Sequence, residues 1–176
     1  MGSRYLAGHL RDYETVAREL EQEIVYYDAY MALFMRYLEE YLSGEATIAD
    51  ATVSLEDLPT ENHVAYQGMG GDWEIVTAIM AEEAPFLAFA QRYSGEELAE
   101  LDDMAVDAVE EFLNVVNGFF SVQLAKGEPT MELDLEPPQY ARDVEPLGSH
   151  LLSLRLHLDF GDIYVLLSSD VVFGET

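Results

Sequence analysis

Apolar and polar residues alternate near the C-terminal end of the chain, and this pattern constrains the fold more than any other. Leucine occupies every second position from Leu152 to Leu158, and Phe160 continues the series. A period of two indicates a β-strand with one face in the core. Gly161 and Asp162 then predict a tight turn into a second strand over residues 163–169. Because strands joined by a tight turn pair antiparallel, we expect an antiparallel sheet.

Four further segments have strand character. Residues 63–69 and 72–80 alternate in a similar way, and the Gly70-Gly71 pair between them predicts a hairpin turn. Residues 46–55 and 131–136 are expected to add shorter strands.

Other regions show helical periodicity. Between residues 11 and 42, apolar side chains recur at spacings of three and four, which predicts one long helix or two in series. Residues 82–93 read as a shorter amphipathic helix. Ser94 and Glu97 form a capping-box pattern, which predicts a further long helix over residues 96–125.

Helices and hairpins therefore mix in one chain of 176 residues, a length that suits a single domain. The expected fold class is α+β, with two layers: a mostly antiparallel sheet covered on one face by long helices. We expect one domain over residues 1–176. Its successive parts are a long N-terminal helix (1–45), strands (46–80), helices (82–126) and strands (131–173).

Charge and composition limit the classes of function. The chain has 8 Lys and Arg against 35 Asp and Glu, a net charge of −27. This charge repels nucleic-acid phosphates and anionic lipids, so we expect neither nucleic acid nor membrane as a partner. No stretch is apolar for long enough to span a bilayer, and the start lacks a signal-peptide pattern, so the cytoplasm is the expected location. There is no cysteine, and the four histidines lack metal-ligand spacing, so no metal site is expected.

A polar ridge marks the expected helix over residues 96–125. Asp107, Glu111 and Asn114 are spaced at i, i+4 and i+7, which places them within about 60° of one another around the helix axis. Acidic residues on a solvated helix face are common, and the spacing alone is compatible with no function. Asparagine is less expected in mid-helix, since it is a poor helix former with no capping role there. A second asparagine, Asn117, precedes Gly118.

The pattern Asp-x-x-x-Glu-x-x-Asn on a long helix, here Asp107, Glu111 and Asn114, resembles the signature of the CheC/CheX/FliY chemotaxis phosphatases. Pro137 stands in the place of the family's downstream proline, and the resemblance covers about residues 63–173. CheC-like members usually carry the Glu-x-x-Asn element twice, whereas the N-terminal helix of this chain has no asparagine. The chain is therefore most similar to the single-motif CheX branch. The resemblance implies a CheC-like fold and a homodimer.

The resemblance also implies a function, a phosphatase that accelerates hydrolysis of the aspartyl phosphate of a CheY-type response regulator. Asn114 would orient the attacking water and Glu111 would pair with a lysine of the regulator, with Asp107, Asn117 and Gly118 in supporting places. The protein would need no cofactor of its own, because Mg²⁺ would be bound by the partner regulator.

An alternative follows from Leu113, which occupies a position where the family usually has a small residue. In this alternative the chain is a catalytically inert CheX-like module that docks a receiver domain or assembles as a dimer.

Overall fold

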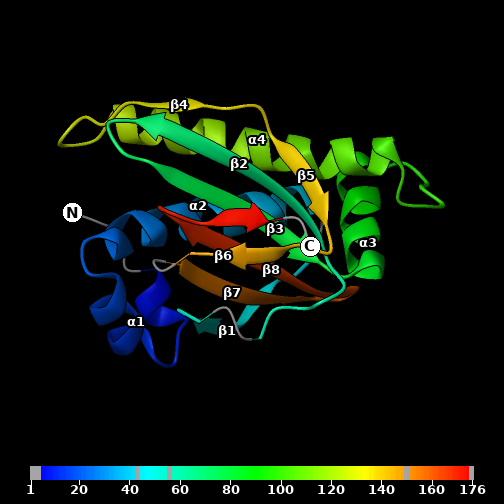
Figure 1. The fold of residues 1–176 in the computed structure, drawn as a ribbon, viewed down its shortest axis with the longest axis horizontal. Coiled ribbons are helices and arrows are strands. Elements are labelled where there is room, and N and C mark those ends of the chain that lie inside the picture. The colour runs from blue at the N-terminus through cyan, green and yellow to red at the C-terminus, as the bar shows by residue number, and fades with distance from the viewer. Residues whose placement is uncertain (1–4, 43, 55–56, 149–150, 175–176) are drawn as a thin grey trace.

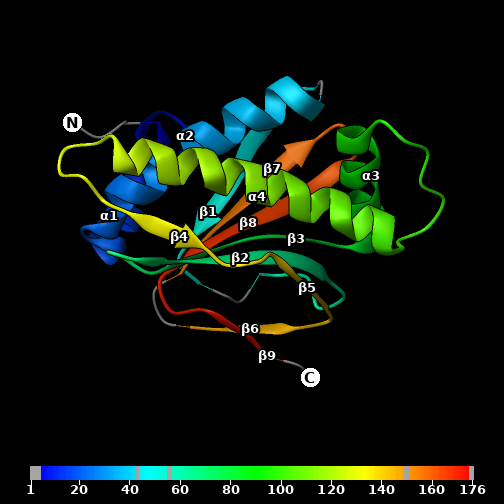
Figure 2. The same ribbon diagram turned by 90° about the horizontal axis from the view of Figure 1, so that it is seen from above.

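The computed structural model of the protein describes residues 5–42, 44–54, 57–148 and 151–174. Leu55, at the end of the expected first strand, and His150 lie outside the described residues, as do the two ends of the chain. The expected α+β class is confirmed: helices lie on one face of an antiparallel sheet, as Figure 2 shows.

The N-terminal region forms two α-helices in series. A short 3₁₀ turn, η1 (Leu6–Gly8), precedes α1 (Tyr13–Leu20) and α2 (Glu23–Leu42). Glu21 separates the two helices with a positive φ of 54°, a conformation that interrupts helical hydrogen bonding. Of the two possibilities left open by the periodicity, the structure therefore has the broken helix.

Two more helices, α3 (Glu83–Ser94) and α4 (Asp103–Ala125), follow the first hairpin. The predicted capping box of Ser94 and Glu97 is wrong. Gly95 instead ends α3 in the left-handed conformation, with φ of 73°. The N-cap of α4 is Asp102, whose carboxylate accepts a hydrogen bond from the Ala105 N–H at 3.1 Å. The long helix thus begins later than its helix-forming sequence suggests.

The main sheet is antiparallel throughout, in the order β1-β7-β8-β3-β2-β4, and β5 also pairs with β2. Its strands are β1 (Thr47–Thr52), β2 (His63–Gly71), β3 (Ile75–Ala81), β4 (Leu133–Leu135), β5 (Gln139–Arg142), β7 (Leu151–Leu158) and β8 (Gly161–Ser168). Both predicted hairpins exist, but their turns are displaced. Gly70 and Gly71 belong to β2, and the second turn is at residues 159–160.

A small second sheet, β6 (Glu145–Leu147) and β9 (Val172–Gly174), lies on the face of the main sheet opposite the helices (Figure 2). It helps to cover a minor apolar cluster that includes Val64, Met80 and Leu166. This partial third layer is not predicted from the sequence. It explains why Leu151, on the outward phase of its strand, is also buried.

The main core fills the space between the helices and the sheet. The helix α4 runs along this core, beside β2 and β4 (Figure 1). Phe112 of α4 is fully buried and meets Phe34, Phe89 and Tyr93 edge-on, with ring centroids 5.3, 4.9 and 5.3 Å apart. This aromatic packing fixes the rotation of α4 about its axis. It therefore decides which side chains of the helix face solvent.

Candidate functional site

The outer face of α4 carries the polar ridge predicted from the sequence. Asp107, Glu111 and Asn114 are all exposed, and Gly118, one turn further on, is half-exposed. The side of the helix turned toward the core is buried; its buried residues are Ala105, Val109, Phe112, Leu113, Val116, Asn117 and Phe120. A carboxylate and an amide one turn apart are thus held together on the surface of a rigid helix.

Leu113 belongs to the buried face, with a relative exposure of 0%. Although it precedes Asn114 in the sequence, successive helical residues point about 100° apart. The leucine side chain enters the core while the asparagine remains outside. Leu113 therefore does not stand between Asn114 and a protein that approaches the ridge.

Asn117 is the one proposed supporting residue that the structure places inside the protein, with a relative exposure of 0%. Its Nδ2 donates to Gln67 Oε1 and to Thr77 Oγ1, both at 2.8 Å. Its Oδ1 accepts from the hydroxyl of Tyr30 at 2.6 Å and from Thr77 at 3.1 Å. A polar group this deep is stable because all its hydrogen-bonding atoms are paired. Asn117 is therefore part of the interior and does not widen the exposed ridge.

Gln67 connects this buried group to the surface. Its Nε2 donates to Asn114 Oδ1 at 2.7 Å and to the backbone carbonyl of Glu136, also at 2.7 Å. Glu136 immediately precedes Pro137, so a single side chain joins two parts of the recognised sequence pattern that lie far apart in the chain. We call the five residues Tyr30, Gln67, Thr77, Asn114 and Asn117 the amide network.

Three members of the amide network were not predicted from the sequence as part of the site: Gln67, Thr77 and Tyr30. Gln67 and Thr77 occupy inward positions of their strands and are direct partners in the β2–β3 register. Two polar residues that face each other on the otherwise apolar side of a hairpin would have indicated the site. This indication requires the register of the hairpin, which the sequence alone does not give.

The ridge is acidic, and its charges are close enough to influence one another. Glu110 is half-buried beside Asp107, and burial together with the neighbouring carboxylate of Asp107 raises the pKa of Glu110. Among the described residues, no salt bridge pairs Asp107, Glu110 or Glu111 with a cation. This face of α4 therefore presents negative charge that none of the described salt bridges neutralises.

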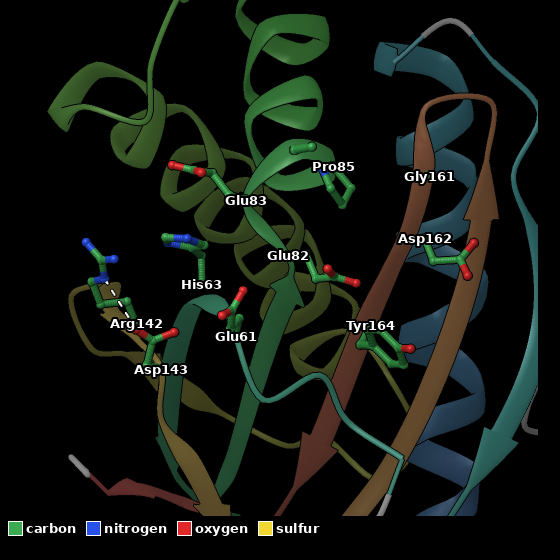
Figure 3. A pocket seen from close by; sticks show the side chains of 11 residues that line it. Glu61, His63, Glu82, Glu83, Pro85, Arg142, Asp143, Gly161, Asp162 and Tyr164 are labelled. Carbon is green, nitrogen blue, oxygen red and sulfur yellow. Dashed lines mark ion pairs between the residues drawn. The ribbon is translucent and has the colours of Figure 1, made fainter.

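A hollow of about 720 Å³ lies at another part of the surface, where the ends of β2, β3, β5 and β8 meet (Figure 3). Ligand pockets of this size are mostly lined by apolar side chains. This one is walled largely by carboxylates; they belong to Glu61, Glu82, Glu83, Asp143 and Asp162. None of the ridge residues lines it, so the hollow and the ridge are separate features.

Two further features are absent from the part of the chain that the structure describes: a cluster of metal ligands and a membrane-spanning helix. No three His, Cys, Asp or Glu side chains are grouped so that they could hold a metal ion. None of the described helices combines the length and apolar character needed to cross a membrane.

Comparison with known proteins identifies one family. Residues 63–152, which are 90 of the 176 residues, match the model of the family described as chemotaxis phosphatase CheX. The matched region contains all of α4 and the amide network except Tyr30. No curated protein sequence matches this chain.

Solved structures with the same fold include two CheX proteins and a FliY protein. CheX from Borrelia burgdorferi, in a complex described as CheX-CheY-BeF3-Mg²⁺, is 22% identical with a TM-score of 0.66, over 81% of this chain and 96% of that one. CheX from Vibrio vulnificus is 19% identical with a TM-score of 0.64, over 79% and 95%. FliY from Thermotoga maritima is 14% identical with a TM-score of 0.61, over 87% and 91%.

Proposed function

This chain belongs to the CheX family of chemotaxis phosphatases, and we propose that it accelerates hydrolysis of the aspartyl phosphate on a response-regulator receiver domain. The observation that carries the proposal is the exposure of Glu111 and Asn114 together on the outer face of α4. Had the core packing turned this face toward the sheet, neither side chain could reach a partner. The recognised pattern and its solvent-facing placement thus agree.

The surface around the ridge suits a protein partner. Exposed apolar side chains flank it along α4, with Met104, Phe119 and Val122 each at least half exposed. A Cβ added to Gly118 would meet nothing within 4 Å, although glycine inside a helix costs about 1 kcal/mol relative to alanine. Among the described residues no packing explains this glycine, whereas close approach of a partner helix or loop does. A receiver domain is such a partner, and the related Borrelia protein is named in a complex with CheY.

The proposed chemistry needs positioning rather than a covalent intermediate. The transition state of phosphoryl transfer is loose, so an in-line water and electrostatic stabilisation supply most of the acceleration. The Asn114 amide can accept a hydrogen bond from the water while it donates to the phosphoryl group. Glu111 would pair with the lysine of the receiver and fix the docked pose. Mg²⁺ would arrive with the receiver, and the reaction would take place in the cytoplasm.

Replacing Glu111 by glutamine is expected to raise the Kd for an activated receiver about tenfold and to change kcat little, because the carboxylate holds the partner without touching the water. The difference from wild type should shrink as salt is raised, since ions screen the pair. Titration calorimetry with a beryllofluoride-activated receiver at two salt concentrations measures both effects.

Glu110→Gln is the matched control, because it removes the same charge from the adjacent position, where the side chain is half-buried beside Asp107. It should leave the affinity within about twofold of wild type, an estimate that allows for weak effects of exposed charges. Equal losses from the two substitutions would mean that only the overall negative field matters, and would contradict the assigned role of Glu111.

The proposal is tested by measuring phosphate loss from each receiver domain encoded in the same genome, with and without this protein. Acceleration for at least one receiver is expected. Binding without acceleration would favour the alternative of an inert docking module. A homodimer indifferent to changes at Glu111 and Asn114, without receiver binding, would favour an assembly role. Dimerisation itself stays a prediction of the family resemblance, and sedimentation of the purified protein tests it.

A further inference from the structure

We propose that Gln67 is a positioning residue that fixes which end of the Asn114 amide faces the receiver, an inference that rests on the proposed phosphatase function. Gln67 is 1% exposed and lies on β2, beneath the outer face of α4. The Nε2 of Gln67 donates a hydrogen bond of 2.7 Å to Oδ1 of Asn114, and this bond links Gln67 directly to the exposed amide. It does not itself reach the surface of the ridge.

The orientation of the Gln67 amide follows from a backbone atom. The carbonyl oxygen of Glu136 can only accept a hydrogen bond, so the side-chain atom 2.7 Å from it must be the donor nitrogen. The second proton of that nitrogen is directed at Asn114. An interchange of the nitrogen and oxygen of Gln67 would place its oxygen against the Glu136 carbonyl and leave Asn117 Nδ2 without this acceptor.

Proline explains why that carbonyl is available. β4 and β5 both pair with β2, and the register shifts by one residue between them, from Met69 opposite Leu135 to Tyr66 opposite Gln139. Pro137 and Pro138 occupy the break and have no N–H to donate to the ladder. Glu136 still donates to the Gly68 carbonyl at 2.9 Å, and its own carbonyl turns to the Gln67 side chain.

Asn117 holds the other end of the Gln67 amide. Its Nδ2 donates to Gln67 Oε1 at 2.8 Å, while Thr77 and Tyr30 hold Asn117 in turn. Tyr30 comes from α2 and Thr77 from β3, so the network connects two helices, α2 and α4, to the sheet beneath them. Among the described residues, no buried side-chain nitrogen or oxygen lacks a hydrogen-bond partner. A fully paired network of this kind has one preferred arrangement.

The consequence falls on Asn114. Because its Oδ1 is held against Gln67, its Nδ2 is directed away from the sheet, toward the side from which a receiver approaches. The Nδ2 protons can then donate to a phosphoryl oxygen, and the second lone pair of Oδ1 can accept from the attacking water. The side chain is ordered before the receiver docks, which removes an entropic cost from the reaction.

The test is Gln67→Met, which keeps the length of the side chain and removes both donors. We expect kcat for phosphate loss from a receiver to fall about tenfold or more, with the Kd for the beryllofluoride-activated receiver unchanged. In the Asn114→Ala background the same substitution should lower kcat no further, because Gln67 acts through Asn114.

Asn62→Leu is the control for lost stability. Asn62 is also a buried amide, 1% exposed, and bonds to backbone groups of Pro59 and Val144 away from α4. It should lower the melting temperature as Gln67→Met does and leave kcat at the wild-type value.

Three outcomes are distinguishable. Loss of kcat with retained affinity, absent in the Asn114→Ala background, supports the inference. Wild-type kcat in Gln67→Met, or a loss that adds to that of Asn114→Ala, overturns the inference and leaves the phosphatase function standing. If the wild type accelerates no receiver, the phosphatase proposal fails. The ¹⁵N relaxation of the Asn114 side-chain amide then decides: an ordered amide that becomes mobile in Gln67→Met supports the orienting role, and equal mobility overturns it.

Discussion

Replacing Asn114 by alanine is expected to remove most of the acceleration of phosphate loss, with kcat lower by about 10²-fold or more. Alanine leaves the water beside the aspartyl phosphate without its orienting amide. Since this reaction depends on positioning and charge, no other part of the transition-state stabilisation replaces it. The measurement is release of inorganic phosphate from a receiver phosphorylated with acetyl phosphate, at saturating concentrations of wild type and variant.

The fold should survive this substitution, because Asn114 is exposed and water can replace it as a partner of Gln67. We expect a change in unfolding free energy within about 0.5 kcal/mol, as for ordinary surface sites.

Asn117→Ala is expected to destabilise the protein much more than Asn114→Ala. It leaves hydrogen-bonding atoms of Gln67, Thr77 and Tyr30 unpaired in the interior, and each buried unpaired group costs about 1–3 kcal/mol. Equal stability losses in the two variants would contradict the distinction between an exposed and a buried asparagine.

Much of the fold could be predicted from local periodicity. The strands near Leu152 and the helical stripe of the N-terminal region appear where the patterns place them, because each pattern reflects one face turned to the core. Boundaries depended on contacts that no local pattern contains. Gly95 and Asp102 decide where α3 ends and α4 begins, although the residues between them have good helix propensity.

Gln67 and Thr77 were not predicted as part of the site because the hairpin register expected from the sequence differs from the actual register of β2 and β3. A two-residue turn at Gly70-Gly71 would place Gln67 opposite Glu74, whereas the actual register places it opposite Thr77. That shift conceals the two inward polar residues that meet Asn117 between the strands and the helix. The exposed ridge could be predicted because it depends on helical spacing alone, but the amide network depends on pairing between distant segments.

The burial of Asn117 could not be predicted from the sequence either. Around the helix it is about 60° from Asn114, and Glu111 and Asn114 are separated by about the same angle. Spacing alone could therefore place it on the ridge or at its inner border. The presence of Gln67, Thr77 and Tyr30 opposite it makes burial of this amide favourable, and those partners come from three different elements.

The second large effect is expected from Leu113→Gly, which should destabilise the protein and should not raise its activity. Truncating a buried leucine to alanine costs about 2–5 kcal/mol. Glycine adds about 1 kcal/mol for the helix. Because Leu113 is fully buried, its removal opens a cavity beneath α4 and clears no space on the outer face.

Leu113→Ala separates the cost of the cavity from the cost of glycine in a helix. It creates the cavity, but alanine is a good helix former. Thermal unfolding should show a melting temperature lower by about 4–20 °C for this variant, from about 2–4 °C per kcal/mol in a domain of this size. At a temperature where Leu113→Ala is folded, its kcat should equal or fall below that of wild type. A folded Leu113→Ala protein with higher kcat than wild type would mean that the leucine does hold the receiver away, and would revive the inert docking module as the function of the natural chain. The buried position of the side chain argues for the opposite result, because a residue can obstruct a partner only where the partner can reach it.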